Sequence, residues 1–128
     1  MNYRIVLILF AGFSSISLIK SKTTHDLIGN WKFHEVSEET TNCIAPKPFP
    51  IKTLNFSDST FRVIGLNDTI TGNYYVFSDK INMVNALKNG KAVKDDETLK
   101  IIEINNRYLT LGLPMECGEL EMIFKKIK

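Results

Sequence analysis

The sequence of 128 residues has few of the side chains on which catalytic and metal sites depend. Only two histidines occur, His25 and His34, and neither stands at a metal-binding spacing from either of the two cysteines, Cys43 and Cys117. The sequence has no nucleophile elbow and no glycine-rich phosphate-binding loop. We therefore predict that the protein is not an enzyme and that it holds no metal or cofactor.

An excess of charge of one sign is also lacking. Lysine and arginine number 16 and aspartate and glutamate 14, which gives a formal net charge of +2. No long basic stripe is present, so nucleic acid is not expected as a partner. The acids Asp95, Asp96 and Glu97 stand together, but they follow three lysines in the polar stretch 85–98. A solvated loop of mixed charge is therefore expected there rather than a metal site.

A hydrophobic run long enough to cross a membrane is missing as well. The apolar segment 5–19 has about 15 residues, whereas a bilayer-spanning helix needs about 20. Arg4 precedes this segment and a polar stretch follows it, which is the pattern of a secretory signal peptide. Residues 1–21 are therefore predicted to be removed on export to the periplasm or the cell exterior, leaving a single domain over 22–128. The alternative is an uncleaved N-terminal anchor.

Export changes what the two cysteines predict. In an oxidising compartment, Cys43 and Cys117 are expected to form a disulfide. The bridge would close a loop of 75 residues, for which the chain-entropy treatment gives a stabilisation of about 4–4.5 kcal/mol. The alternative, a cysteine nucleophile or a pair of metal ligands, would need further ligands that the sequence does not supply.

The chain is rich in short β-type runs separated by turn residues. Within these runs hydrophobic and polar residues alternate, as in strands with one buried face. Most connections are short enough for hairpins, and closing an eight-stranded sheet removes its two exposed edges. We predict an all-β fold, an eight-stranded antiparallel up-and-down barrel. The expected strands cover residues 30–37, 51–56, 59–64, 70–77, 80–84, 99–104, 107–113 and 119–127.

The order of these runs agrees with the expected disulfide. In a meander barrel with an even number of strands, the last strand returns antiparallel to the first. The end of the first strand then lies near the start of the last. Cys43 follows the first expected strand and Cys117 precedes the last one. A bridge between them is therefore consistent with closure of the barrel.

Several segments resemble small lipocalin-like domains. The segment LIGNWKF at 27–33 is similar to the opening of these domains, which begin with a Gly-x-Trp at the first strand. The resemblance extends over nearly the whole of residues 22–128. Four further segments carry it: LNFSDSTF at 54–61, TGNYYV at 71–76, YLTL at 108–111 and MIFKK at 122–126.

The resemblance implies both a structural role and a function. Trp31 would close the bottom of the barrel. A small apolar ligand would be held inside the barrel or at its open end, near the stretch 85–98. Trp31, Phe61, Tyr74 and Tyr108 are the predicted ligand-binding residues, since pockets are mostly apolar with few polar groups. The alternative is that the aromatic side chains fill the core and leave no cavity.

A second resemblance is to META-type heat-shock domains, which are also small exported β proteins. It rests on the order of Gly65, Asn67, Gly72 and Tyr74. With a filled core, such a domain would act by contacting another protein. The segment 43–50 (CIAPKPFP) is the predicted contact surface, because its three prolines stiffen it and it is expected to be exposed. The protein is expected to be a monomer.

Overall fold

The computed structural model describes residues 24–37 and 43–127. The predicted signal peptide, residues 1–21, lies outside the described residues. Among the residues described, no helix is long and apolar enough to span a membrane. A single helical turn at 24–27 precedes a succession of strands. The strands are β2 (Gly29–Ser37), β3 (Ile51–Phe56), β4 (Thr60–Gly65), β5 (Thr69–Phe77), β6 (Lys80–Lys88), β7 (Lys91–Ala92), β8 (Glu97–Ile104), β9 (Tyr108–Met115) and β10 (Gly118–Ile127).

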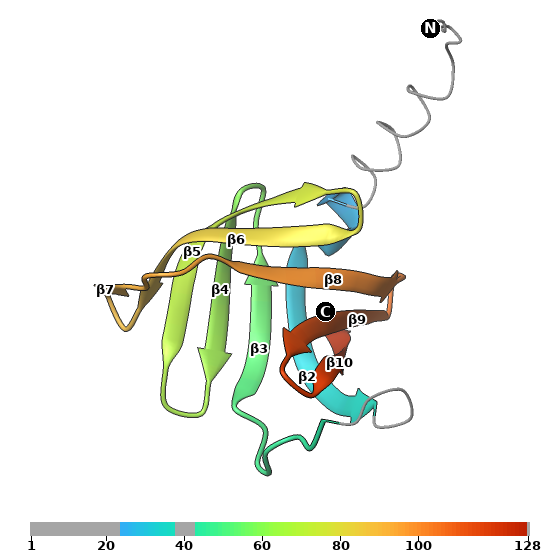
Figure 1. Ribbon diagram of the computed structural model, residues 1–128. Helices are drawn as coiled ribbons and strands as arrows, with labels where there is room; N and C mark the ends of the chain where they lie inside the picture. Colours follow the sequence, from blue (N-terminus) through green and yellow to red (C-terminus); the bar gives the residue numbers. More distant parts are fainter. Residues whose placement is uncertain (1–23, 38–42, 128) are drawn as a thin grey trace, which may run out of the picture.

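Eight of these strands form a closed antiparallel barrel (Figure 1). The sheet order is β5-β4-β3-β2-β10-β9-β8-β6, with the two-residue β7 beside β6, and β5 also pairs with β6. Strands that follow one another in the chain are therefore neighbours, and β10 closes the ring against β2. The predicted all-β, eight-stranded antiparallel barrel is confirmed, because every strand edge except the short β7 is paired.

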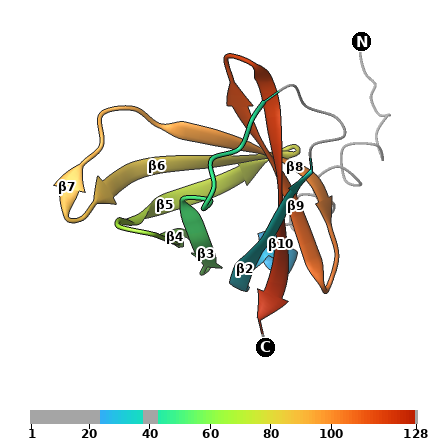
Figure 2. The same cartoon turned by 90° about the horizontal axis from the view of Figure 1, so that it is seen from below.

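The polar stretch 85–98 differs from the expected loop. β6 continues to Lys88 and turns at Asn89 and Gly90 into β7, so the first part of the stretch is a hairpin. Asn89 and Gly90 have φ values of 52° and 84°, which is the backbone that a two-residue hairpin turn requires and that Asn-Gly favours. Figure 2 shows this hairpin projecting away from the other strands. β8 begins at Glu97, two residues earlier than the sequence pattern indicated.

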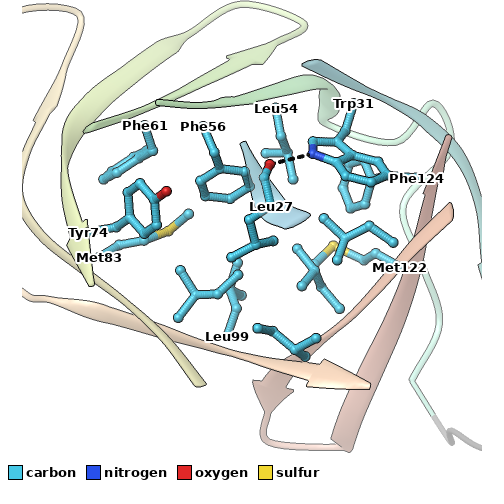
Figure 3. Close-up of a cluster of buried hydrophobic side chains, with 14 of the residues drawn as sticks. Leu27, Trp31, Leu54, Phe56, Phe61, Tyr74, Met83, Leu99, Met122 and Phe124 are labelled. Carbon is cyan, nitrogen blue, oxygen red and sulfur yellow. Dashed lines mark hydrogen bonds between the residues drawn. The ribbon is translucent and has the colours of Figure 1, made fainter. Parts of the chain in front are cut away.

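The core fills the barrel from the alternating inward positions of the strands. In β9, for example, Leu109 and Leu111 are fully buried, as the period of two requires. Figure 3 shows the cluster, in which aromatic and aliphatic side chains from opposite walls meet. The buried members are Leu27, Trp31, Cys43, Leu54, Phe56, Phe61, Tyr74, Ile81, Met83, Leu99, Ile101, Leu109, Leu111, Leu120, Met122 and Phe124.

The helical turn 24–27 covers one end of the barrel, which we call the closed end. Leu27 and Trp31 are both fully buried there. The indole Nε1–H of Trp31 donates a hydrogen bond of 2.9 Å to the carbonyl oxygen of Leu27 (Figure 3). Lys126 lies over the same ring, with its Nζ 4.9 Å from the ring centroid, and donates to the carbonyl oxygen of Ile28. Trp31 thus occupies the bottom of the barrel, the position that the resemblance implied.

The predicted disulfide is present near the opposite end, which we call the open end. Cys43 and Cys117 are bonded, with their Cα atoms 5.2 Å apart. The bond joins the segment before β3 to the turn between β9 and β10. In the same segment, the ring of Phe49 stacks on that of Phe33, with centroids 4.3 Å apart. The prediction of a Cys43–Cys117 bridge is therefore confirmed.

Candidate functional site

A cavity of about 240 Å³ lies inside the barrel toward its open end. Most of its lining is aliphatic, and the residues come from seven of the eight barrel strands. Val93 and Asp95 are added by the connection between β7 and β8. The lining residues are Ile51, Leu54, Phe61, Val63, Ile70, Met83, Ala86, Val93, Asp95, Glu97, Leu99, Leu113, Met122 and Phe124.

The size of the side chains explains why the cavity is at this end. An eight-stranded barrel is just wide enough for side chains to fill it or for one small ligand. Toward the closed end the interior holds Trp31, Phe56 and Tyr74, which are large and almost fully buried. Toward the open end the inward positions hold smaller side chains, among them Val63 and Ala86. The barrel is thus filled with side chains at the closed end and contains the cavity toward the open end.

Two carboxylates lie in this apolar lining. Asp95 belongs to the connection before β8, and Glu97 is the first residue of β8. Glu97 lies on the same face of the strand as Leu99 and Ile101, which are both buried, but Glu97 itself is exposed, as is Asp95. Both carboxylates therefore lie at the mouth of the cavity. No lysine, arginine or histidine of the described residues lines the cavity. Asp95 and Glu97 therefore give the described part of the mouth a negative charge.

The four predicted ligand-binding residues lie in different places. Phe61 lines the cavity. Trp31 is buried at the closed end, and Tyr74 is buried against Phe56, with ring centroids 5.1 Å apart. Tyr108 lies outside the barrel beside His34, with ring centroids 5.9 Å apart. The structure thus brings Phe61 to the cavity. Trp31 and Tyr74 belong to the packed core between the cavity and the closed end, and Tyr108 belongs to the outer surface.

The environment of Tyr74 indicates a structural role for its hydroxyl group. The hydroxyl donates a hydrogen bond to the carbonyl oxygen of Ser57, in the turn between β3 and β4. Burial raises the pKa of the Tyr74 phenol above its ordinary value, and the nearby carboxylate of Asp58 raises it further. The phenol therefore stays protonated at neutral pH and holds the turn to β5.

Most of the cavity residues were missed by inspection of the sequence. Val63, Ile70, Leu99 and Leu113 were assigned to strands but not to a site. Their inward position follows from the period of two, which could have identified them as lining a barrel interior. Among the described residues, no group of three or more histidine, cysteine, aspartate or glutamate side chains could hold a metal ion.

Comparison with known proteins identifies the fold. The sequence matches no protein-family model and none of the curated proteins compared with it. A lipocalin-like protein from Bacteroides uniformis has a similar structure, with a TM-score of 0.52 at 20% sequence identity, covering 80% of this chain and 99% of that one. An uncharacterized protein from Bacteroides eggerthii has a TM-score of 0.56 at 15% identity, covering 79% of this chain and 99% of that one.

These similarities define the class of the protein by its fold. The chain has a lipocalin-like fold, because its eight-stranded antiparallel barrel aligns with these two structures over 79–80% of its own length and 99% of theirs. The first of the two resemblances seen in the sequence is therefore confirmed. At 15–20% identity the similarity concerns the fold alone.

Proposed function

We propose that the protein is a binding protein, not an enzyme, and that it holds one small, largely apolar molecule in the cavity at the open end. The observation that carries the proposal is the cavity of about 240 Å³ in a barrel whose other half is packed. Apolar pockets with a few polar groups are the usual form of small-molecule sites. A filled core, the alternative considered for the sequence, would not leave this space.

The volume limits the size of the ligand. An apolar protein cavity of about 150 Å³ stays dry and holds benzene. In proportion, a cavity of about 240 Å³ has room for a molecule of about ten non-hydrogen atoms. A ligand of this size is expected to bind with a Kd of about 10–100 μM. Long-chain lipids and multi-ring pigments would exceed the space available.

A titration with propylbenzene tests this proposal directly. Amide NMR spectra of the isotope-labelled protein are expected to show saturable shifts for residues around Phe61, Val63 and Ile70. Ala86→Phe should abolish these shifts, because position 86 lines the cavity and the ring would fill it. Ala92→Phe is the matched control, since Ala92 is exposed and lies outside the lining.

A native mass spectrum of the protein from an exporting host provides a second measurement. Mass that is lost on denaturation would identify a retained natural ligand. If propylbenzene gives no shifts and the native and denatured masses agree, the binding proposal is wrong.

Export is the second part of the proposal. It is supported by the Cys43–Cys117 disulfide, which suits an oxidising compartment, and by the apolar segment 5–19 in the sequence. Mass spectrometry of the protein recovered outside the cytosol is expected to give a chain that starts near residue 22. A full-length chain in the membrane fraction would indicate the uncleaved anchor instead.

Contact with a protein through segment 43–50 is a second candidate function. The observation in its favour is Ile44, whose side chain is 92% exposed next to a buried disulfide cysteine. A photo-crosslinking residue at position 44 is expected to give a defined adduct in exporting cells, while one at the exposed position 52 on β3 should not. The same pattern of adducts from both positions would speak against this contact surface.

A further inference from the structure

The mouth of the cavity combines an apolar wall with unpaired negative charge. Asp95 and Glu97 line the cavity together with twelve residues that carry no charge. Within residues 24–37 and 43–127, neither carboxylate group takes part in a hydrogen bond or ion pair. Both side chains are exposed, so they lie at the mouth of the cavity and not in its interior.

The neighbouring lysines do not neutralise these carboxylates in the structure. Lys91 and Lys94 are exposed and are not among the lining residues. The Nζ of Lys88 lies 3.6 Å from a carboxylate oxygen of Asp68, outside the cavity. A positive group that enters the mouth therefore meets two carboxylates, and no cation from the described part of the chain lies among the lining residues.

We propose that the ligand of this cavity is a small organic cation, a primary or secondary amine with an aromatic or branched apolar body. The apolar body would lie against Phe61, Val63 and Leu99, and the ammonium group would remain at the mouth between Asp95 and Glu97. This proposal rests on the proposed binding function and specifies its ligand class. An anion of the same shape is disfavoured, because like charges repel at the mouth.

Three probes of nearly equal size test the charge preference. They are 2-phenylethylamine, which is a cation at neutral pH, propylbenzene, which is neutral, and phenylacetate, which is an anion. The oxidised wild-type protein is expected to bind the cation about tenfold more tightly than the anion, with propylbenzene between them. Sodium chloride should reduce the preference, since the carboxylates lie where salt screens them.

A double variant and a matched control test whether Asp95 and Glu97 cause the preference for the cation over the anion. Asp95→Asn with Glu97→Gln is expected to reduce the cation-to-anion ratio to about twofold or less, while propylbenzene still binds. Asp96→Asn removes the same charge from the same connection at a position that does not line the cavity, so it should keep the wild-type ratio. Circular dichroism and propylbenzene binding confirm that each variant is folded.

The outcomes separate the two proposals. If none of the three probes binds to the wild type, the binding function is wrong and the cation inference fails with it. If propylbenzene binds but the cation and the anion bind equally, the cation inference alone is wrong. If the preference survives in the double variant, or is lost in Asp96→Asn, the assignment to Asp95 and Glu97 is overturned.

Discussion

Tyr74 connects two parts of the barrel that are far apart in sequence. Its ring packs edge-on against Phe56 at the end of β3, and its hydroxyl group bonds to Ser57 in the following turn. The backbone N–H of the same residue donates to the carbonyl oxygen of Ser59, 2.9 Å away. One residue of β5 thus fixes the β3–β4 turn with both its backbone and its side chain.

The raised pKa of Tyr74 predicts a loss of stability at alkaline pH. The folded protein keeps the phenol proton at pH values above 10.0, where the unfolded chain releases it. The folded state then binds more protons than the unfolded state, so the free energy of unfolding falls as the pH rises through this range. In Tyr74→Phe this part of the decrease should be absent, which urea unfolding at pH 8 and pH 11 would measure.

The same variant should also be less stable at neutral pH. Loss of the hydrogen bond to Ser57 is expected to lower the free energy of unfolding by about 1 kcal/mol. Tyr75→Phe is the control, because Tyr75 is the neighbouring residue on β5 and its side chain is 57% exposed. An identical pH dependence in both variants would contradict the role given to Tyr74.

Gly72 is a second residue whose surroundings decide which side chain can be present, because no space is left there for a Cβ atom. A Cβ atom built there would lie 2.8 Å from the carbonyl oxygen of Val84 and 2.9 Å from a ring carbon of Phe61. Gly72→Ala is therefore expected to lower the free energy of unfolding by about 1–3 kcal/mol, since the β6 backbone must move. Thr69→Ala on the exposed face of the same strand should cost much less. Equal effects on the midpoint of urea unfolding would contradict this explanation.

At the level of the elements, most strands could be predicted because turn residues mark where each strand begins and ends. Ser57, Asp58, Asn105 and Asn106 stand between alternating runs, and the observed strands begin and end within two residues of the predicted limits at these places. The alternation of apolar and polar residues in these runs also agrees with the buried positions of β9 and β10. The residue types at the turns were sufficient to predict these strand limits, because a hairpin is formed by residues that are close together in the sequence.

The β6–β7 hairpin shows where the pattern was misleading. Asn85 lies in β6 at a φ of 54°, and the pairing with β5 shifts opposite it, between Thr71 and Asn73. This irregularity interrupts the alternation, so the sequence pattern predicts a loop where β6 continues. The Asn89-Gly90 pair was the available signal, since it is the strongest short hairpin signal in a sequence.

The candidate site could be predicted less well than the fold. Phe61 was identified, but the depth at which each aromatic side chain lies depends on the register around the whole ring. For this reason Trp31 and Tyr74 lie between the cavity and the closed end, and Tyr108 lies on the outer surface of the barrel. The sequence pattern predicts that Glu97 is solvated and lies in a loop; Glu97 is exposed, but it belongs to β8, which begins two residues before Leu99. The place of Glu97 opposite Met83, and hence beside the mouth of the cavity, follows only from the pairing of β6 with β8.

For the whole molecule, closure depends on the contact between β2 and β10, the first and last strands of the barrel. Its register runs from Ser37 with Glu121 to Asn30 with Ile127. The disulfide lies beyond one end of this pairing, and Lys126 with Trp31 lies at the other. A contact between such distant segments carries a large entropic cost, which a crosslink in the unfolded chain reduces.

The disulfide should therefore contribute strongly to stability. Cys43→Ser with Cys117→Ser is expected to lower the free energy of unfolding by about 2–4 kcal/mol, because the residues are 74 positions apart in sequence. Reduction of the wild-type protein should give the same loss in urea unfolding monitored by Trp31 fluorescence. A change below about 0.5 kcal/mol, within the range of ordinary surface substitutions, would contradict this prediction.

The pairing of Asn30 with Ile127 has a consequence for how the chain could be connected. The start of β2 lies beside the end of β10. The chain could therefore begin at another strand of the ring without changing which strands are neighbours. A short linker from β10 back to β2, with a new opening in the turn between β4 and β5, would produce a circular permutant with every strand pairing retained. Its termini would then lie at the open end, where a fused reporter would stand beside the cavity.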